Sequence, residues 1–78
     1  MASKIINVDA EIMNGTPVFW GTRVPVKNLF DYLESGETLE QFLDDFPSVK
    51  KKQAIGALEI AQRLLTKSSE ILNESIVR

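Results

Sequence analysis

Residues 15–26, near the N-terminus, constrain the fold of this chain more than any other segment. These twelve residues contain two glycines, two prolines, an arginine and the only tryptophan of the sequence. The preceding Asn14 and the first glycine, Gly15, indicate a tight turn, because both residue types tolerate the positive φ of a primed hairpin turn. Pro25 fixes φ where a helical pattern begins. The segment therefore predicts a β-hairpin that leads into a helix, with Arg23 at the junction.

Short apolar runs supply the expected strands. Residues 5–8 form a largely β-branched run and predict an N-terminal strand. Ile12 and Met13 lie before the predicted turn and residues 18–20 lie after it, so these two runs are expected to pair as the hairpin. Pro17 has no N–H group and is expected at an edge position of this sheet.

Beyond residue 25 the apolar residues recur at the three- and four-residue spacing of helices. The first helix is expected to begin at Val26 and to end at Gly36, which supplies a left-handed cap. A capping box at residues 38–41 begins a second, short helix, which Pro47 terminates. A third helix starts near residue 50, so the sequence predicts three helices after the β segment.

The third helix carries an apolar stripe that is longer than a small domain can cover. Small residues come first and leucines such as Leu65 come later, and the stripe continues through Ile71, Leu72 and Ile76. Because no glycine or proline follows Gly56, the helix is expected to reach the mid-70s, a length of roughly 35–40 Å. The last dozen residues must therefore project, dock on a partner or fray.

Composition excludes several classes of function. The 78 residues include no cysteine and no histidine, so the chain has no disulfide, thiol nucleophile, imidazole base or ordinary zinc site. It also has no phosphate-binding glycine loop, and we expect no enzymatic activity, cofactor or small-molecule substrate. We expect a cytoplasmic protein, because the apolar runs are too short for a membrane span and no secretory signal is evident. A core this small is often completed by association, which predicts a homodimer.

A local basic cluster is the candidate site for DNA. The net charge is −2, so any contact with nucleic acid must come from such a cluster and not from a global field. Lys50, Lys51, Lys52 and Gln53 follow a short helix and a tight turn, which is the order of a helix-turn-helix, whose second helix contacts bases with its first residues. These four residues are the predicted DNA contacts; the alternative is a solvated charge run.

Four residues of the N-terminal segment are predicted to be structural. Trp20 is expected in the core or in a dimer interface; the alternative is a surface against which a ligand lies. Arg23 is expected to pair with an aspartate of residues 44–45 while it stacks on an aromatic ring, and the alternative is that it contacts a phosphate. Ile5 and Phe19 belong to strands too few to close a sheet alone, and an exchanged strand pairing between two protomers would bury them.

The combined pattern resembles a known family. The motif GTRVPV at residues 21–26, preceded by the turn residues and followed by the helical patterns of residues 29–47 and 57–61, is similar to a small antitoxin-like family built around GTR-I/V-P-V and catalogued as a numbered domain of unknown function. The similarity covers roughly residues 5–65. It implies a homeodomain-like three-helix DNA-binding fold with an N-terminal β segment, and pairing with a PIN-like ribonuclease for which the protein is the VapB-type antitoxin.

Two departures from the family pattern affect the candidate site. The family usually has proline after the aspartate near position 9, where this chain has Ala10. It usually opens the third helix with threonine or serine followed by a carboxylate, where this chain has Lys50 and Lys52. The helix start becomes strongly basic, and the lost N-cap costs about 1 kcal/mol unless Ser48 replaces it.

We therefore expect a mainly α chain with residues 1–25 as a β segment, residues 26–65 as a homeodomain-like three-helix domain containing the helix-turn-helix, and residues 66–78 as a helical tail. The expected function is that of a dimeric antitoxin that represses its own operon by binding operator DNA. The alternative is an interaction module that dimerises, binds an acidic protein and has no operator.

The tail is expected to contact the ribonuclease through its apolar stripe, in the helix-in-groove mode. The predicted contacts are Leu65, Ile71, Leu72 and Ile76. The alternative is that the tail is a plain extension of the dimer core.

Overall fold

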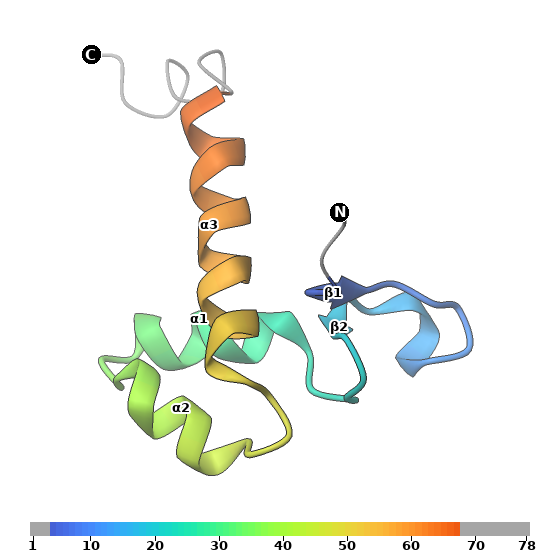
Figure 1. Cartoon of the computed structure of the whole chain (residues 1–78), viewed down its shortest axis with the longest axis horizontal. Coiled ribbons are helices and arrows are strands. Elements are labelled where there is room, and N and C mark those ends of the chain that lie inside the picture. The colour runs from blue at the N-terminus through green and yellow to red at the C-terminus, as the bar shows by residue number, and fades with distance from the viewer. Residues whose placement is uncertain (1–3, 68–78) are drawn as a thin grey trace.

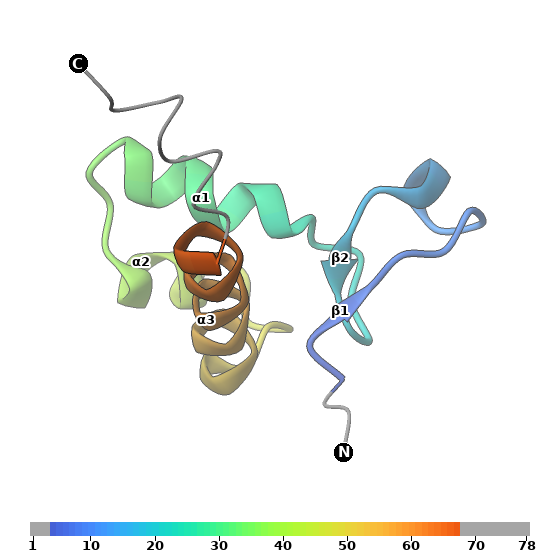
Figure 2. The ribbon, with the colours of Figure 1, turned by 90° about the horizontal axis from the view of Figure 1, so that it is seen from above.

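The computed structural model describes residues 4–67. Its elements are, in order, β1 (Ile6–Asn7), the 3-10 turn η1 (Met13–Gly15), β2 (Val18–Phe19), α1 (Val26–Glu34), α2 (Leu39–Asp45) and α3 (Lys51–Lys67), as Figure 1 shows. Three helices follow a small N-terminal hairpin, which confirms the predicted mainly α class. Figure 2 looks nearly along α3 and shows α2 on one side of it, the hairpin on the other, and α1 running past it toward the hairpin.

The hairpin pairs different strands from those predicted. β1 and β2 are antiparallel, with Ile6 opposite Phe19 and Asn7 opposite Val18. The N–H of Trp20 donates to the carbonyl of Ile5 at 2.9 Å and extends this pairing by one residue. The partner of β2 is therefore the N-terminal run, and the predicted pairing with residues 12–13 is wrong.

The Asn-Gly turn forms within η1 instead of joining two strands. Met13, Asn14 and Gly15 have φ values of 51°, 58° and 85°, in the left-handed region that asparagine and glycine adopt most easily. The N–H of Gly15 donates to Ile12 and that of Thr16 to Met13, each at 3.1 Å. The carbonyls of Ile12 and Met13 thus accept hydrogen bonds within the turn, and these two residues do not pair with β2 as a strand.

The ends of α1 and α2 follow the sequence signals. Gly36 has a φ of 93°, and its N–H donates to the carbonyl of Leu33 at 3.1 Å. Thr38 Oγ1 accepts the N–H of Gln41 at 3.0 Å, which confirms the predicted N-cap. The Gln41 side chain does not complete the box, because its Nε2 donates to Asp45 Oδ1 at 3.0 Å.

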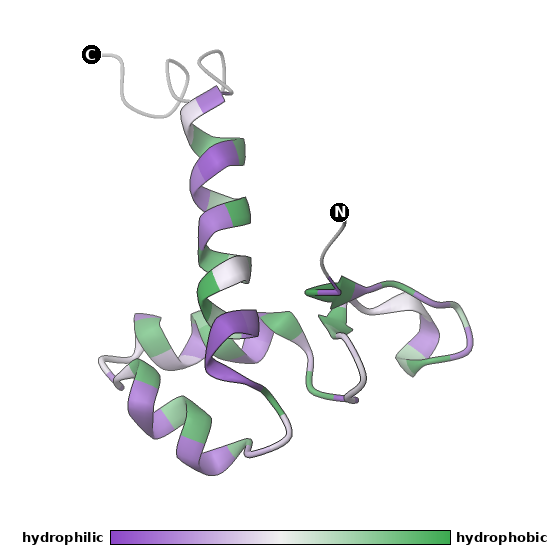
Figure 3. Ribbon diagram, viewed as in Figure 1, coloured by the Kyte–Doolittle hydropathy of each residue, from purple (hydrophilic) through white to green (hydrophobic). Residues whose placement is uncertain are grey.

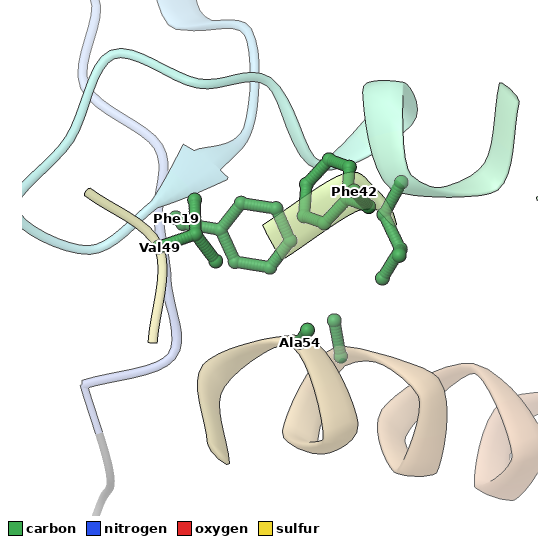
Figure 4. Close-up of a cluster of buried hydrophobic side chains, with 6 residues drawn as sticks. Phe19, Phe42, Val49 and Ala54 are labelled. Atoms are coloured by element: carbon green, nitrogen blue, oxygen red, sulfur yellow. The ribbon is translucent and has the colours of Figure 1, made fainter. Parts of the chain in front are cut away.

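The core joins β2 to the three helices. Its buried side chains come from β2, α1, α2, the turn before α3 and the first half of α3: Phe19, Leu29, Phe42, Val49, Ala54 and Ala57. The rings of Phe19 and Phe42 lie 6.0 Å apart between centroids, and the small Ala54 lets α3 approach them (Figure 4). Phe19 is thus covered within one chain, and no strand exchange is needed to bury it.

The second half of α3 extends beyond this core. Leu64 and Leu65 are 64% and 55% exposed, although they continue the stripe that begins with Ala54 and Ala57. Figure 1 shows α3 rising away from α1 and α2, and Figure 3 shows apolar positions recurring to its end. The predicted tail contacts Ile71, Leu72 and Ile76 lie outside the described residues. Within residues 4–67, none of the helices combines the length and apolar character that crossing a membrane requires.

Candidate nucleic-acid interface

The three lysines of the predicted site lie together at the start of α3. Lys50 precedes the helix, Lys51 and Lys52 form its first two positions, and all three side chains are exposed. Cations are unfavourable at a helix N-terminus, because the helix dipole is positive there. Within residues 4–67 the only ion pair joins Lys27 to Asp31 at 2.8 Å, so none of the three lysines forms an ion pair with a carboxylate of the described chain.

Gln53, the fourth predicted DNA contact, is instead a structural residue. Its side chain is largely removed from solvent, since only 8% of its surface is exposed. Its Oε1 accepts the N–H of Lys50 at 2.9 Å, and its Nε2 donates to the carbonyls of Trp20 at 2.9 Å and Lys4 at 3.4 Å. The amide is fully used by the backbone and has no group left for a base edge, so we remove Gln53 from the predicted contacts.

The same bonds show how α3 begins without serine or threonine. A glutamine at the third helical position accepts the N–H of the N-cap residue, which is one half of a capping box. Lys50 is this N-cap residue, because its carbonyl accepts the N–H groups of Gln53 and Ala54 at 2.9 and 3.1 Å. Gln53, and not Ser48, therefore supplies the side-chain cap of α3.

Gln53 also brings the N-terminal segment against the lysines. A surface groove of about 430 Å³ lies where the two meet. Its lining residues come from the first described residues, the end of the hairpin and the start of α3: Lys4, Ile5, Trp20, Lys50, Lys52 and Gln53. We call this hollow the basic groove. It adds Lys4 to the predicted lysines, a contact that the sequence pattern did not indicate.

Trp20 forms one wall of the basic groove. It is 41% exposed, so the predicted place in the core is wrong, while the alternative, a dimer interface, stays a prediction. Lys4 Nζ lies 5.5 Å from the centroid of its ring, within the range of a cation–π interaction. The cation beside the indole is thus Lys4 and not the predicted Arg23.

Arg23 does not form the predicted ion pair with residues 44–45. Asp45 instead accepts a hydrogen bond from Tyr32 Oη at 2.6 Å, and Arg23 is exposed. The preceding turn explains its position, because Thr22 Oγ1 donates to the carbonyl of Phe19 at 2.8 Å and accepts the N–H of Val24 at 3.0 Å. This closed turn leaves the intervening side chain outside the fold.

Much of the negative charge of the molecule is carried by α1, α2 and their connection. The hairpin lies on one side of α3, while the α1–α2 connection lies on the other (Figures 1 and 2). The exposed acidic residues of α1, α2 and their connection are Asp31, Glu34, Glu37, Glu40, Asp44 and Asp45, while Asp9 and Glu11 are exposed in the loop of the hairpin. Because no acidic side chain lines the basic groove, an anionic partner would approach the molecule there. No cluster of acidic groups within the described part of the chain could hold a metal ion.

Comparison with known proteins places the chain in a family. Residues 6–61 match the family described as "Protein of unknown function (DUF433)". The chain belongs to the DUF433 family. It is also 38% identical over 48 residues to "Uncharacterized protein y4eO" of Sinorhizobium fredii (strain NBRC 101917 / NGR234), a match that covers 62% of this chain and 22% of that protein. The chain thus spans about a fifth of that relative's length, and no solved structure matches it.

The DUF433 match includes most of the basic groove. Trp20, Lys50 and Lys52 lie inside the matched range, and Lys4 lies just before it. Leu65, which was predicted to contact the ribonuclease, lies near the end of α3. It is outside both the lining of the basic groove and the range of the family match.

Proposed function

We propose that this DUF433 protein is the antitoxin of a type II toxin–antitoxin pair. In this proposal it is a cytoplasmic homodimer that binds operator DNA, represses its own operon and neutralises a PIN-like ribonuclease. The supporting observation is the group of three exposed lysines at the start of α3, which have no carboxylate partner in the described chain and follow α2 after a short turn. Lysines bind DNA phosphates, and a helix in this position contacts DNA with its first residues.

The turn between α2 and α3 supports the same reading, because it is hydrogen-bonded and anchored in the core. The N–H of Val49 donates to the carbonyl of Phe46 at 3.0 Å, and the Val49 side chain is buried in the core. The start of α3 is therefore held in one orientation relative to α2. A fixed orientation of this kind is what a recognition helix requires to enter the major groove in a defined register.

The neutralising role is supported by the exposed end of α3. Leu64 and Leu65 project beyond the core on the stripe that the sequence continues toward the C-terminus. Apolar helical stripes commonly bind partner proteins by lying in a groove. The ribonuclease partner itself is inferred from the resemblance of the chain to antitoxins.

The proposal is tested by DNA binding at several salt concentrations. Labelled duplex from upstream of the chain's own gene is titrated with the protein, and binding is followed by fluorescence anisotropy. The Lys50→Ala/Lys51→Ala/Lys52→Ala variant should bind more weakly, and the slope of log K against log salt should fall by about 0.9 for each phosphate that the variant no longer neutralises. The matched control, Lys27→Ala/Lys67→Ala, removes exposed lysines elsewhere and should keep the slope.

Two results would contradict the proposal. If the wild-type protein does not bind the duplex in a salt-dependent way, the interaction-module alternative, with an acidic protein as partner, becomes the better reading. If the lysine variant binds as the control does, the start of α3 does not bind DNA. The proposed neutralisation of the ribonuclease is tested by co-expression with a PIN-like ribonuclease encoded beside this gene. If the ribonuclease alone stops growth, an antitoxin should restore it.

A further inference from the structure

We propose that Lys4 and Trp20 are DNA contacts as well, and that the basic groove holds a phosphate of the duplex backbone at its lysines with the adjoining sugar against the indole ring. This inference rests on the proposed function and extends the DNA-binding surface from α3 onto the N-terminal hairpin. It gives Trp20 a role in binding, whereas the sequence alone suggested a structural one.

The first argument is the charge of the groove. Three lysines, Lys4, Lys50 and Lys52, line one hollow of about 430 Å³ although they come from two distant parts of the described chain. Like charges brought together repel one another, and no acidic side chain lines this groove to offset them. A phosphate group, which forms charge-assisted hydrogen bonds with ammonium groups, fits this arrangement.

The second argument is the exposed indole. A large aromatic side chain contributes most to stability when it is buried, yet the only tryptophan of the chain is 41% exposed beside these lysines. The DNA backbone alternates charged phosphates with apolar sugar rings. The groove correspondingly combines lysines with an apolar wall formed by Trp20 and Ile5.

The third argument is that the groove is held in place by buried bonds. Gln53 Nε2 binds the carbonyls of both Lys4 and Trp20, and the N–H of Trp20 binds the carbonyl of Ile5. These bonds use the backbone atoms of Lys4 and Trp20, so they fix the segment and leave both side chains available. A site fixed before binding loses less conformational entropy when the ligand arrives.

A neighbouring hollow marks where the basic surface ends. It has a volume of about 330 Å³ and continues along α3 from Lys52 and Ile5. Its lining includes Glu59 together with Arg63, so its charges are mixed. The phosphate backbone should therefore cross from the lysines of α3 toward Lys4 and Trp20 and should not follow α3 upward.

The test uses the fluorescence of Trp20, which no other tryptophan obscures. Titration with the upstream duplex should change its intensity or emission maximum in the wild-type protein. Lys4→Ala should lower the salt slope by about 0.9. Trp20→Ala should weaken binding about fivefold with little change of slope, a size at the low end of aromatic contacts with nucleic acids. Lys67→Ala serves as the control and should behave as wild type.

The outcomes separate this inference from the proposed function. One set of results would overturn the groove contact alone. In it, the α3 lysine variant has a smaller slope of log K against log salt, Lys4→Ala keeps the wild-type slope, and Trp20 fluorescence stays constant at saturating duplex. DNA binding by α3 would then stand without the groove. If the wild-type protein binds no duplex, both proposals fail. Trp20→Phe, which keeps an aromatic wall, guards against misfolding: it should retain most of the affinity, and equal losses in Trp20→Phe and Trp20→Ala with wild-type circular dichroism would overturn the packing role.

Discussion

One buried amide determines how the N-terminal segment meets α3. A glutamine side chain can bind a base edge or cap a helix. Because Gln53 follows three lysines in the sequence, it was predicted to contact DNA. The structure shows that Gln53 binds the carbonyl of Lys4, a residue far away in the chain, and this contact has no local sequence signal. The exposure of the three lysines could be predicted, because it follows from charge alone; their contact with DNA stays a prediction.

Replacement of Gln53 should therefore affect stability before it affects binding. Gln53→Ala leaves the N–H of Lys50 and the carbonyl of Trp20 without partners, which should lower the free energy of unfolding by about 1–3 kcal/mol. Gln53→Glu keeps the acceptor and loses the donor, so its stability should lie between those of the wild type and Gln53→Ala. Urea denaturation measures both.

The control for this comparison is Gln62→Ala, an exposed glutamine of the same helix, which should change stability by no more than about 0.5 kcal/mol. A Gln53→Ala protein of wild-type stability that had lost DNA affinity would instead restore the original reading of this residue.

The hydrogen bond between Tyr32 and Asp45 should make the stability of the fold decrease at alkaline pH. The hydrogen bond from Tyr32 Oη to Asp45 at 2.6 Å, together with desolvation and the negative charge of Asp45, raises the pKa of Tyr32 above its usual 10.0. The folded state thus holds this proton more tightly than the unfolded state. Its contribution to stability is complete below pH 10.0 and is lost as the pH rises through the raised pKa.

Tyr32→Phe should remove this dependence while it keeps the ring contacts with Phe42 and Phe46. Between neutral pH and pH values above 10.0, the urea midpoint of the wild-type protein should fall more than that of the variant. Effects of pH that do not involve Tyr32 are common to both proteins and cancel in the difference. Parallel pH profiles would show that the hydrogen bond does not persist in solution.

Among the secondary-structure elements, those with local signals were predicted well and those with distant partners were not. Gly36 and Thr38 end α1 and begin α2 through bonds within a few residues. The strand partner of β2 is set by tertiary packing, which brings residues 6–7 beside it and not residues 12–13. Turn residues such as Asn14 fix only the local φ and do not determine that choice. The predicted ion pair of Arg23 failed for the same reason, because it required a contact between two separate elements.

The packing of Ile5 on α3 explains a glycine in the middle of this helix. A Cβ atom at Gly56 would lie 2.7 Å from Ile5 Cδ1 and 3.2 Å from Cγ1. Alanine in place of a helical glycine normally adds about 1 kcal/mol of stability. Here the added methyl group must displace Ile5, so we expect Gly56→Ala to gain less than that amount.

A double-mutant cycle isolates the contact. In an Ile5→Ala background the obstruction is gone, and Gly56→Ala should show the full gain of about 1 kcal/mol. Urea denaturation of the four proteins gives the coupling free energy. Additive effects of the two substitutions would mean that the N-terminal segment does not rest on α3 in solution.

For the molecule as a whole, the net charge does not indicate the local basic groove. A net charge of −2 gives no indication of nucleic acid, yet Lys4 joins Lys50 and Lys52 in a groove whose lining includes no acidic side chain, and six of the eleven acidic residues lie on α1, α2 and their connection. The sequence predicted this separation only in part, since the acidic helices and the basic helix start are local features. The position of Lys4 follows from the tertiary fold, which places the first described residues beside residue 50.

The exposed end of α3 leads to the last prediction. Leu64 and Leu65 add little to the core because more than half of each side chain is exposed. Leu64→Gln/Leu65→Gln should therefore leave folding and DNA binding intact, since glutamine forms helices nearly as well as leucine. If the stripe binds the ribonuclease, the double variant should no longer neutralise it in co-expression and nuclease assays. The control, Thr66→Gln, changes an adjacent exposed residue and should neutralise fully.

Sedimentation equilibrium separates the two expected uses of this surface. A double variant that stays dimeric but fails to neutralise the nuclease assigns the stripe to the partner protein. A variant that becomes monomeric and also loses DNA affinity assigns it to the dimer, because a repressor of this kind binds two half-sites through its twofold symmetry. Full neutralisation by an intact dimer would exclude Leu64 and Leu65 from both interfaces, and the prediction for Leu65 would be wrong.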